Sequence, residues 1–485
     1  MRARVSRQQP PAGQTSSVDF PAIGWPVWRL AWVIVFGAFA AGMDASLANI
    51  GLETIATDLD SSLDHVQWVS NGYLLALAVS LPSCAWLSRT FGTGRLWLIA
   101  LLVFTVTSGL CAMAWNIELL IVLRVAQGLS AGVLIPAGQT ILGQAVGPER
   151  LGRVMSILGI VVSLAPALGP VFGGLVLAWW TWPWLFLINV PIGIAGLIMG
   201  LRLVPRGSPE PGTSLDRLGF AYIGVSLPLL VYGLTRWGAG APIGEVLIPL
   251  AGAGFGLGLF VHRSWTRDGP LLDLRLHRNP VFAAASAAAG SCGALLFGST
   301  LIYPLYFQVL HGDSTIITGL RVLCLGGGTA AVLPIAGRLT DRYGGGVVSV
   351  CGSLAAVAAT LPFAFLPAAS NVLVVQALLV VLGMATAFAA IPTSIAAYKT
   401  VRPDQLPDAT AQVNILQRLG GSIGGALFAV VIAGGLSAGS QSAFQSAFAW
   451  QTGAAAVTLV ASFWLFVAQL RSTRNLRAAK QRAGR

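Results

Sequence analysis

Long apolar runs recur along the whole chain, separated by short polar segments. The length of each run is close to or above the minimum for a helix that crosses a bilayer, which is about 20 residues. Lipid offers backbone groups no hydrogen-bond partners, so segments of this kind must be helices. The pattern predicts fourteen spanning helices, at about residues 28–53, 65–88, 95–115, 117–146, 150–177, 182–204, 217–236, 242–263, 280–310, 313–337, 346–367, 370–398, 406–435 and 443–470.

Composition and charge indicate a membrane protein. Of the 485 residues, 55% are hydrophobic and only 9% are charged, and a soluble protein of this size could not bury so much apolar surface. The net charge of +12 does not indicate a nucleic-acid partner, because the Lys and Arg residues fall in alternate connecting segments. The positive-inside rule then predicts a multi-pass protein of the inner (cytoplasmic) membrane with both termini in the cytoplasm.

One short pattern occurs twice. The turn Gly337–Gly344 follows the tenth predicted span, and the similar turn Ala85–Gly92 follows the second. Such repeats are typical of carriers built from two related bundles around a central site. We therefore predict a cytoplasmic arm at 1–27, a six-helix bundle at 28–204, an inserted helix pair with cytoplasmic flanks at 205–278, a second six-helix bundle at 279–470 and a basic cytoplasmic tail at 471–485.

Asp44 is the only carboxylate placed well inside a predicted span. An ionised carboxylate at that depth is costly, so it must be paired, hydrated or neutral. A group that is neutral in one state and ionised in another can carry a proton across a membrane. The fourth span holds Arg124 and Gln127, which are three residues apart and share a helix face. Burial of Arg124 is favoured over its extension to the membrane surface, because charges within spans are usually functional.

Several motifs occur together in a specific order. They are Met43-Asp44-Ala45-Ser46, Arg124 with Gln127-Gly128, Gly169-Pro170 with Gly173-Gly174, Ile188-Asn189-Val190-Pro191, Tyr303 to Gln308, and Gln417-Arg418-Leu419-Gly420-Gly421. Over residues 28–470 the chain resembles the major facilitator superfamily, specifically its fourteen-helix drug:proton antiporter branch (EmrB/QacA-like). The resemblance implies an all-α integral membrane fold of two six-helix bundles plus two inserted helices.

The resemblance also implies a function and roles for particular residues. It implies proton-coupled efflux of small hydrophobic compounds by alternating access, with Asp44 and Arg124 in proton coupling. The fifth span would supply the gate or hinge, at Pro166, Gly169, Pro170, Gly173 and Gly174. A cytoplasmic loop lock is expected at Gly337, Asp341 and Arg342, because the first copy of that turn has Arg89 where the family has an acid.

Polar side chains within the spans are candidates for a substrate cavity. They are Asn49, Asn71, Tyr73, Gln127, Tyr303, Tyr306, Gln308, Arg321 and Arg418. Each could instead form an interhelical hydrogen bond, worth about 0.6 kcal/mol. Arg321 follows Asp313 by eight residues, about 12 Å along a helix. It can extend outward, pair with an acid or face the cavity. Pairing is least expected, because Asp44 lies in the other half, and facing the cavity would disfavour cationic substrates.

Other functions stay open at this stage. One is a dedicated exporter of a single metabolite or self-made antibiotic, and a less favoured one is a membrane sensor that does not transport. No hydrolase, kinase or redox constellation and no metal-ligand spacing is present, so we expect no enzymatic activity, metal or cofactor. The expected partners are a small-molecule substrate, protons and the lipid bilayer, with a periplasmic adaptor undecided.

Overall fold

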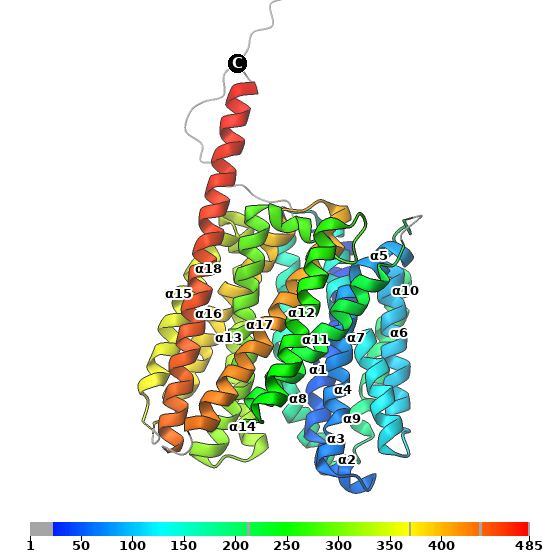
Figure 1. The fold of residues 1–485 in the computed structure, drawn as a ribbon, viewed down its shortest axis with the longest axis vertical. Helices are drawn as coiled ribbons and strands as arrows, with labels where there is room; N and C mark the ends of the chain where they lie inside the picture. The colour runs from blue at the N-terminus through cyan, green and yellow to red at the C-terminus, as the bar shows by residue number, and fades with distance from the viewer. Residues whose placement is uncertain (1–22, 211–213, 368–369, 436–438, 484–485) are drawn as a thin grey trace, which may run out of the picture.

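The computed structural model describes residues 23–210, 214–367, 370–435 and 439–483, and the regular structure in these ranges is helical (Figure 1). The first half contains α1 (Trp25–Ile50), α2 (Leu52–Asp58), α3 (Leu63–Val66), α4 (Trp68–Ser80), η1 (Leu81–Ser83), α5 (Cys84–Phe91), α6 (Thr93–Cys111), α7 (Ile117–Val146), α8 (Leu151–Trp179), α9 (Trp184–Leu187) and α10 (Asn189–Leu203). The second half contains α11 (Arg217–Gly238), α12 (Ile243–Thr266), η2 (Leu274–Arg278), α13 (Pro280–His311), α14 (Thr315–Tyr343), α15 (Gly345–Thr360), η3 (Leu361–Phe365), α16 (Val372–Tyr398), η4 (Pro403–Gln405), α17 (Leu406–Gly435) and α18 (Ser440–Ala483).

The helices account for the predicted spans. Among the described residues, 13 helical segments are long and apolar enough to cross a membrane. The fifth predicted span corresponds to α8, a helix of 29 residues. Side chains start several of these helices: Asn116, Asn279 and Asn371 each accept a hydrogen bond from a backbone N–H in the first turn of the helix that follows. The all-α membrane fold expected from the apolar runs is confirmed.

The spans pack as two bundles with a helix pair between them. Helices α1 to α10 pack on one another, and so do α13 to α18. Helices α11 and α12 pack mainly on each other, and α11 also contacts α4 of the first bundle and α17 of the second. The two bundles meet where α14 packs on α8 and α17 on α7. The inserted pair therefore lies against both bundles.

The two copies of the repeated turn share a backbone conformation. Gly92 ends α5 with φ 83° and ψ 133°, and Gly344 ends α14 with φ 88° and ψ 153°. This region strains any residue with a Cβ, which explains the glycine at the end of both copies. The repeat in the sequence is thus a repeat in the structure.

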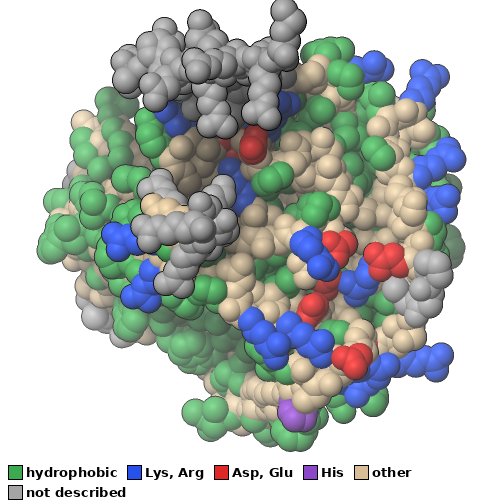
Figure 2. Space-filling model, turned by 90° about the horizontal axis from the view of Figure 1, so that it is seen from above, with side chains coloured by type: hydrophobic (Ala, Val, Ile, Leu, Met, Phe, Trp, Pro, Cys, Tyr) green, Lys and Arg blue, Asp and Glu red, His purple; other side chains and the backbone are tan. Residues whose placement is uncertain are grey.

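Exposed basic side chains gather at one end of the bundle, which we call the basic face; the other end is the opposite face. The basic face carries the exposed side chains of Arg95, Arg202, Arg217, Arg338 and Arg402. Figure 2 shows Lys and Arg side chains on this face with several carboxylates among them. Helix α18 extends beyond it (Figure 1). The basic segment expected as a tail from residue 471 therefore begins inside α18, because Arg, Lys, Gln and Ala all favour helix.

Candidate functional site

Asp44 and Arg124 form an ion pair inside the first bundle. Arg124 Nη1 lies 2.5 Å from Asp44 Oδ2, and the two side chains are 0% and 1% exposed. Helix α1 supplies the acid and α7 the base, so the pair joins two helices that are 80 residues apart in sequence. A buried pair of this kind is stable only when further hydrogen bonds satisfy its remaining polar atoms.

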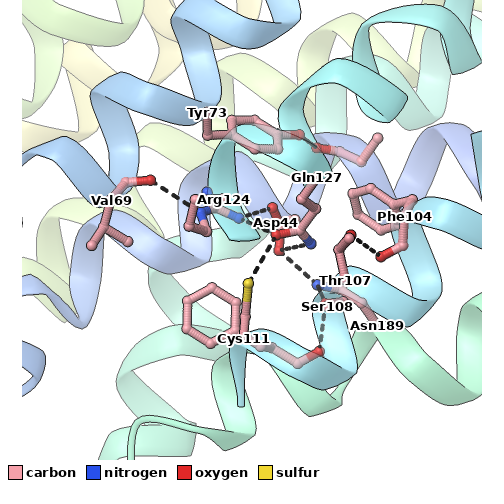
Figure 3. A network of polar contacts seen from close by, with 12 residues as sticks. Asp44, Val69, Tyr73, Phe104, Thr107, Ser108, Cys111, Arg124, Gln127 and Asn189 are labelled. Carbon is pink, nitrogen blue, oxygen red and sulfur yellow. Dashed lines mark hydrogen bonds and ion pairs between the residues drawn. The ribbon is translucent and has the colours of Figure 1, made fainter. Parts of the chain in front are cut away.

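Two amides complete the shell around Asp44 (Figure 3). Asn189 of α10 donates its side-chain N–H to Asp44 Oδ1 at 2.8 Å, and Gln127 of α7 donates to the same oxygen at 3.2 Å. Gln127 also accepts from Arg124 Nη1 at 2.7 Å. Asp44 thus accepts from three side chains, all of them buried. Hydrogen bonds from a guanidinium and from amides are the kind that favour a charged acceptor at a buried site.

Arg124 is held from its other sides by backbone and aromatic groups. Its Nε donates to the carbonyl of Val69 in α4 at 3.0 Å. Its Cζ lies 4.2 Å from the centre of the Tyr73 ring and 5.4 Å from that of Phe186. Aromatic faces attract a guanidinium, and do so more strongly when water is excluded. Its Nη2 has no hydrogen-bond partner among the described residues, so one donor of Arg124 is spare.

The second bundle has a neutral group at the corresponding place. Asp44 is the twentieth residue of α1, and Ser299 is the twentieth residue of α13. Ser299 Oγ accepts a hydrogen bond from Gln451 Nε2 of α18 at 2.8 Å, and Gln451 Oε1 accepts one from Tyr303 at 3.0 Å. Among the described residues, the buried network around Ser299 is thus neutral, whereas the network around Asp44 contains charged groups.

The other candidate cavity residues lie in different surroundings. Tyr303 and Tyr306 are buried against Phe448 in the second bundle. Tyr73 belongs to the charged network, where its hydroxyl donates to the carbonyl of Ala41 at 3.1 Å. The structure brings Tyr73 and Gln127 together with the proton-coupling candidates and leaves three other candidates on exposed positions: Asn49, Asn71 and Gln308.

Arg321 has a partner that the sequence argument did not favour. Its Nη1 lies 2.5 Å from Asp313 Oδ2, with side-chain exposures of 19% and 8%. Its Cζ also lies 5.3 Å from the Phe307 ring centre. The expectation that pairing was the least favourable choice is wrong, because Asp313 precedes α14 and its side chain reaches the first turns of the same helix. Arg321 is therefore compensated locally.

The fifth-span glycines lie where α8 packs closely on its neighbours. A Cβ at Gly169 would collide with Ser46 of α1, and one at Gly173 would lie 3.2 Å from Ile50. Gly174 faces Ile316 of α14 across the boundary between the bundles. The absent side chains allow close helix approach. Pro166 and Pro170 are within α8, but their side chains lie outside the described part of the structure.

Among the described residues, two contacts made by carboxylates join the bundles at the basic face, and we call them together the basic-face latch. In the first, Arg89 Nη1 of α5 lies 2.5 Å from Asp408 Oδ2 in the first turn of α17. Asp408 Oδ1 accepts a further hydrogen bond from the backbone N–H of Asp273 at 3.0 Å. This contact ties the first copy of the repeated turn to the second bundle.

In the second contact of the latch, Asp341 of α14 lies at the start of α8. Its two oxygens accept from the backbone N–H groups of Gly152 at 3.0 Å and Arg153 at 3.1 Å, and Lys399 Nζ lies 2.9 Å away. A carboxylate at a helix N-terminus is favoured by the helix dipole. Gly337 also lies in this contact, since its backbone is so close to Gly152 that neither position has room for a Cβ.

The third residue expected in the lock lies outside it. The side chain of Arg342 is exposed, and its Cζ lies 5.2 Å from the ring centre of the adjacent Tyr343. No described contact links Arg342 to the first bundle.

Sequence reasoning assigned no site role to four residues of these networks, although Asn189 belongs to a quoted motif and Arg89 to the repeated turn. Asn189 and Ser108 belong to the charged network, where Asn189 Nδ2 lies 3.3 Å from Ser108 Oγ. Arg89 and Asp408 form the first contact of the latch. The only signal in the sequence was an isolated polar residue in an apolar run at Asn189 and Ser108. In the described ranges, no cluster of three or more His, Cys, Asp or Glu side chains could hold a metal ion.

Comparison with known proteins relates the chain to transporters over most of its length. The family described as Major Facilitator Superfamily matches residues 34–425. The Multidrug resistance protein B homolog of Mycobacterium tuberculosis is 34% identical over 427 residues, covering 87% of this chain and 79% of that protein. The Tetracenomycin C resistance and export protein of Streptomyces glaucescens is 29% identical over 407 residues, covering 83% and 75%. The proton:xylose symporter XylE bound to 6-bromo-6-deoxy-D-glucose is similar in fold, with a TM-score of 0.63 at 14% identity, covering 91% of this chain and 95% of that one.

Proposed function

The chain belongs to the Major Facilitator Superfamily, and from this we propose that it is a proton-coupled efflux antiporter exporting small hydrophobic compounds by alternating access. The observation that carries the proposal is the buried pair of Asp44 and Arg124. A carboxylate held by three donors in a dry bundle is stable when ionised. It can be released from them only when it is neutralised, and proton uptake supplies that neutralisation.

Proton uptake by Asp44 changes the packing around it. A protonated carboxyl no longer balances the charge of Arg124, which then requires another counter-charge. The network connects α1, α6, α7 and α10, so its rearrangement shifts these helices against one another. Helix α1 packs on α8, and α8 packs on the second bundle. A local proton event is thereby coupled to the boundary between the bundles.

The contacts between the two bundles support a state of the transport cycle that is closed at the basic face. Polar contacts between the bundles gather towards the basic face, with Thr140 Oγ1 and Thr410 Oγ1 2.9 Å apart and Asn414 donating to Gln139 at 2.7 Å. We assign the basic face to the cytoplasm of the cell membrane by the positive-inside rule. The closed side is then the cytoplasmic side, and the transporter is poised to exchange substrate for protons outside.

A narrower function has one specific observation in its favour. A relative that is 29% identical is named for tetracenomycin C resistance and export. A dedicated exporter of one antibiotic would use the same proton chemistry. A susceptibility panel in a pump-deficient host separates the two, since a multidrug exporter protects against several unrelated compounds and a dedicated one protects against a single structural class.

The antiport mechanism is tested with Asp44→Asn. We expect substrate-induced proton release from everted vesicles to fall to background, because the amide cannot exchange a proton, while the protein still folds and inserts. Asp64→Asn is the matched control, since Asp64 is exposed at the opposite face. Wild-type proton release from the Asp44 variant, with equal amounts of protein in the membrane, would refute the mechanism.

A further inference from the structure

We propose that Arg418 binds an acidic group of the exported compound, so that the substrates are amphiphilic organic anions bearing a carboxylate or sulfonate. This inference rests on the proposed export function and adds the chemical class of the substrate. It starts from the observation that one deep cation has no counter-charge in the described protein, whereas its neighbours in the first bundle do.

The position of Arg418 follows from the helix on which it lies. It is the thirteenth residue of α17, about 18 Å along the helix axis from the first residue. Residues four apart share a helix face. On that face, Thr410 contacts Thr140 and Asn414 contacts Gln139, both in α7 of the first bundle. Arg418 is the next residue on this face, one turn further from the basic face.

The opposing bundle confirms the direction in which Arg418 points. Arg418 interacts electrostatically with Tyr73 of α4, which also interacts with Asp44 and Arg124. Tyr73 is therefore a neighbour of both the charged network and Arg418. The guanidinium of Arg418 faces the first bundle across the boundary where the two bundles must separate during alternating access.

The other membrane-embedded arginines of the described chain have carboxylate partners. Arg124 pairs with Asp44 and Arg321 with Asp313. No ion pair or hydrogen bond to the Arg418 guanidinium occurs within the described ranges, although its side chain is only partly exposed. An uncompensated charge at this depth is costly, and a bound anion would remove that cost.

Asp44 does not serve as the missing counter-ion. Its two oxygens already accept from Arg124, Gln127 and Asn189, and no ion pair joins it to Arg418 among the described residues. The remaining described acids of the second bundle lie near the ends of its helices: Asp313, Asp341, Asp404 and Asp408. The described protein therefore supplies no counter-ion for Arg418, and an acidic group of the substrate can take that place.

The chemistry of the position selects the substrate class. A planar guanidinium binds carboxylate and sulfonate groups through two parallel hydrogen bonds. One turn beyond Arg418, the side of α17 facing α11 is lined by small residues, with Ser422, Gly425 and Ala426 facing Leu234 across a cavity of about 380 Å³. A compound with one acidic group and an apolar body satisfies both features.

The experiment uses the full chain in proteoliposomes and two fluorescent probes that differ only in charge. One probe is a pyrene with a sulfonate group and the other a pyrene with a trimethylammonium group. Under an imposed proton gradient, we expect the wild type to transport the sulfonate probe in preference to the ammonium probe. Arg418→Gln should lower sulfonate transport about tenfold or more, the effect of losing one charged hydrogen-bond partner.

Three further variants complete the experiment. Arg418→Lys should retain part of the sulfonate transport, and Arg418→Glu should reverse the preference between the probes. Arg321→Gln is the matched control, because its charge is compensated by Asp313, and it should keep the wild-type preference.

The outcomes separate this inference from the antiport mechanism. Absence of sulfonate transport by the wild type, or an unchanged probe preference in Arg418→Gln, would overturn the substrate class. If the substrate class fails in this way, proton-coupled flux of the ammonium probe that Asp44→Asn abolishes would still support the antiport mechanism. Wild-type flux of the sulfonate probe that does not depend on the proton gradient, and that Asp44→Asn leaves unchanged, would instead overturn the antiport mechanism and keep the substrate class.

Discussion

At the scale of single residues, Arg124 is bound through its shape as well as its charge. Its Nη1 reaches Asp44 and Gln127 while its Nε reaches the backbone of Val69, and the Tyr73 ring lies under the guanidinium. A lysine ammonium is a compact point charge and cannot reach these acceptors simultaneously. Position 124 therefore requires a planar cation for full function.

We predict that Arg124→Ala abolishes proton coupling and that Arg124→Lys retains a small part of it. Removing the base leaves a buried carboxylate without its partner, a change that costs about 3–5 kcal/mol in folded proteins. Substrate-induced proton release and the thermal unfolding temperature in detergent are the two measurements.

The double variant Asp44→Asn with Arg124→Gln serves as the control for this prediction. It removes both charges, so it should unfold at a higher temperature than Arg124→Ala and still fail to couple protons. Equal coupling by the Ala and Lys variants would show that Arg124 only fills space.

At the scale of helices, each contact of the basic-face latch joins one copy of the repeated turn to the start of a helix in the other bundle. The acid lies on the turn in one contact and on the helix in the other. In the second copy of the repeated turn, Asp341 supplies the acid and the start of α8 supplies the donors. In the first copy, Arg89 on the turn supplies the base and the start of α17 supplies the acid, Asp408. The acid and its partner have therefore changed sides between the two copies, and both contacts remain attractive.

We predict that the first contact of the latch tolerates exchange of its charges. Arg89→Asp alone places two acids together, and Asp408→Arg alone places two bases together, so each should open the basic face and lower transport. The double exchange should recover part of the loss, because it restores the charge pair but not the hydrogen bond that Asp408 accepts from Asp273. Labelling of a cysteine introduced by Thr410→Cys reports the opening, because Thr410 lies in the closed contact between the bundles.

Arg342→Ala is the matched control for the latch, since that side chain is exposed and lies outside both contacts. It should leave labelling and transport unchanged. If the double exchange is as impaired as the single reversals, the pair does not act through its mutual attraction.

At the scale of the whole molecule, α8 added to the 13 apolar segments makes fourteen spans, an even number that places the start of α1 and the end of α18 at the same face. We predict that this face is cytoplasmic. Reporter fusions after Arg217 and after Arg275, which flank the inserted pair, should both report a cytoplasmic position, and a fusion after Gly240 should report the outside. An external signal at Arg275 would contradict the crossing of both inserted helices.

The sequence was sufficient for the spans and for the charged residues at the centre of the network. Apolar runs of spanning length have few alternative structures in lipid, and a lone carboxylate within such a run is conspicuous. The ion-pair partners of other charged residues were harder to predict from the sequence. Arg89 and Asp408 are 319 residues apart, and no helical period relates them. Asp313 pairs with Arg321 only because the chain reverses at Gly312, which adopts the left-handed conformation.

The confinement of the charged pair to one bundle determines how a membrane potential acts on the two networks. While Asp44 is ionised, its charge cancels that of Arg124, and the electric field exerts no net force on the pair. Once Asp44 is protonated, one positive charge remains, worth about 2.3 kcal/mol per 100 mV if it crosses the whole field. The group formed by Ser299, Gln451 and Tyr303 stays neutral throughout. Under the proposed antiport, voltage would therefore distinguish the protonated first bundle from the unprotonated one, and it would drive that half of the molecule electrically even where the two sides have the same pH.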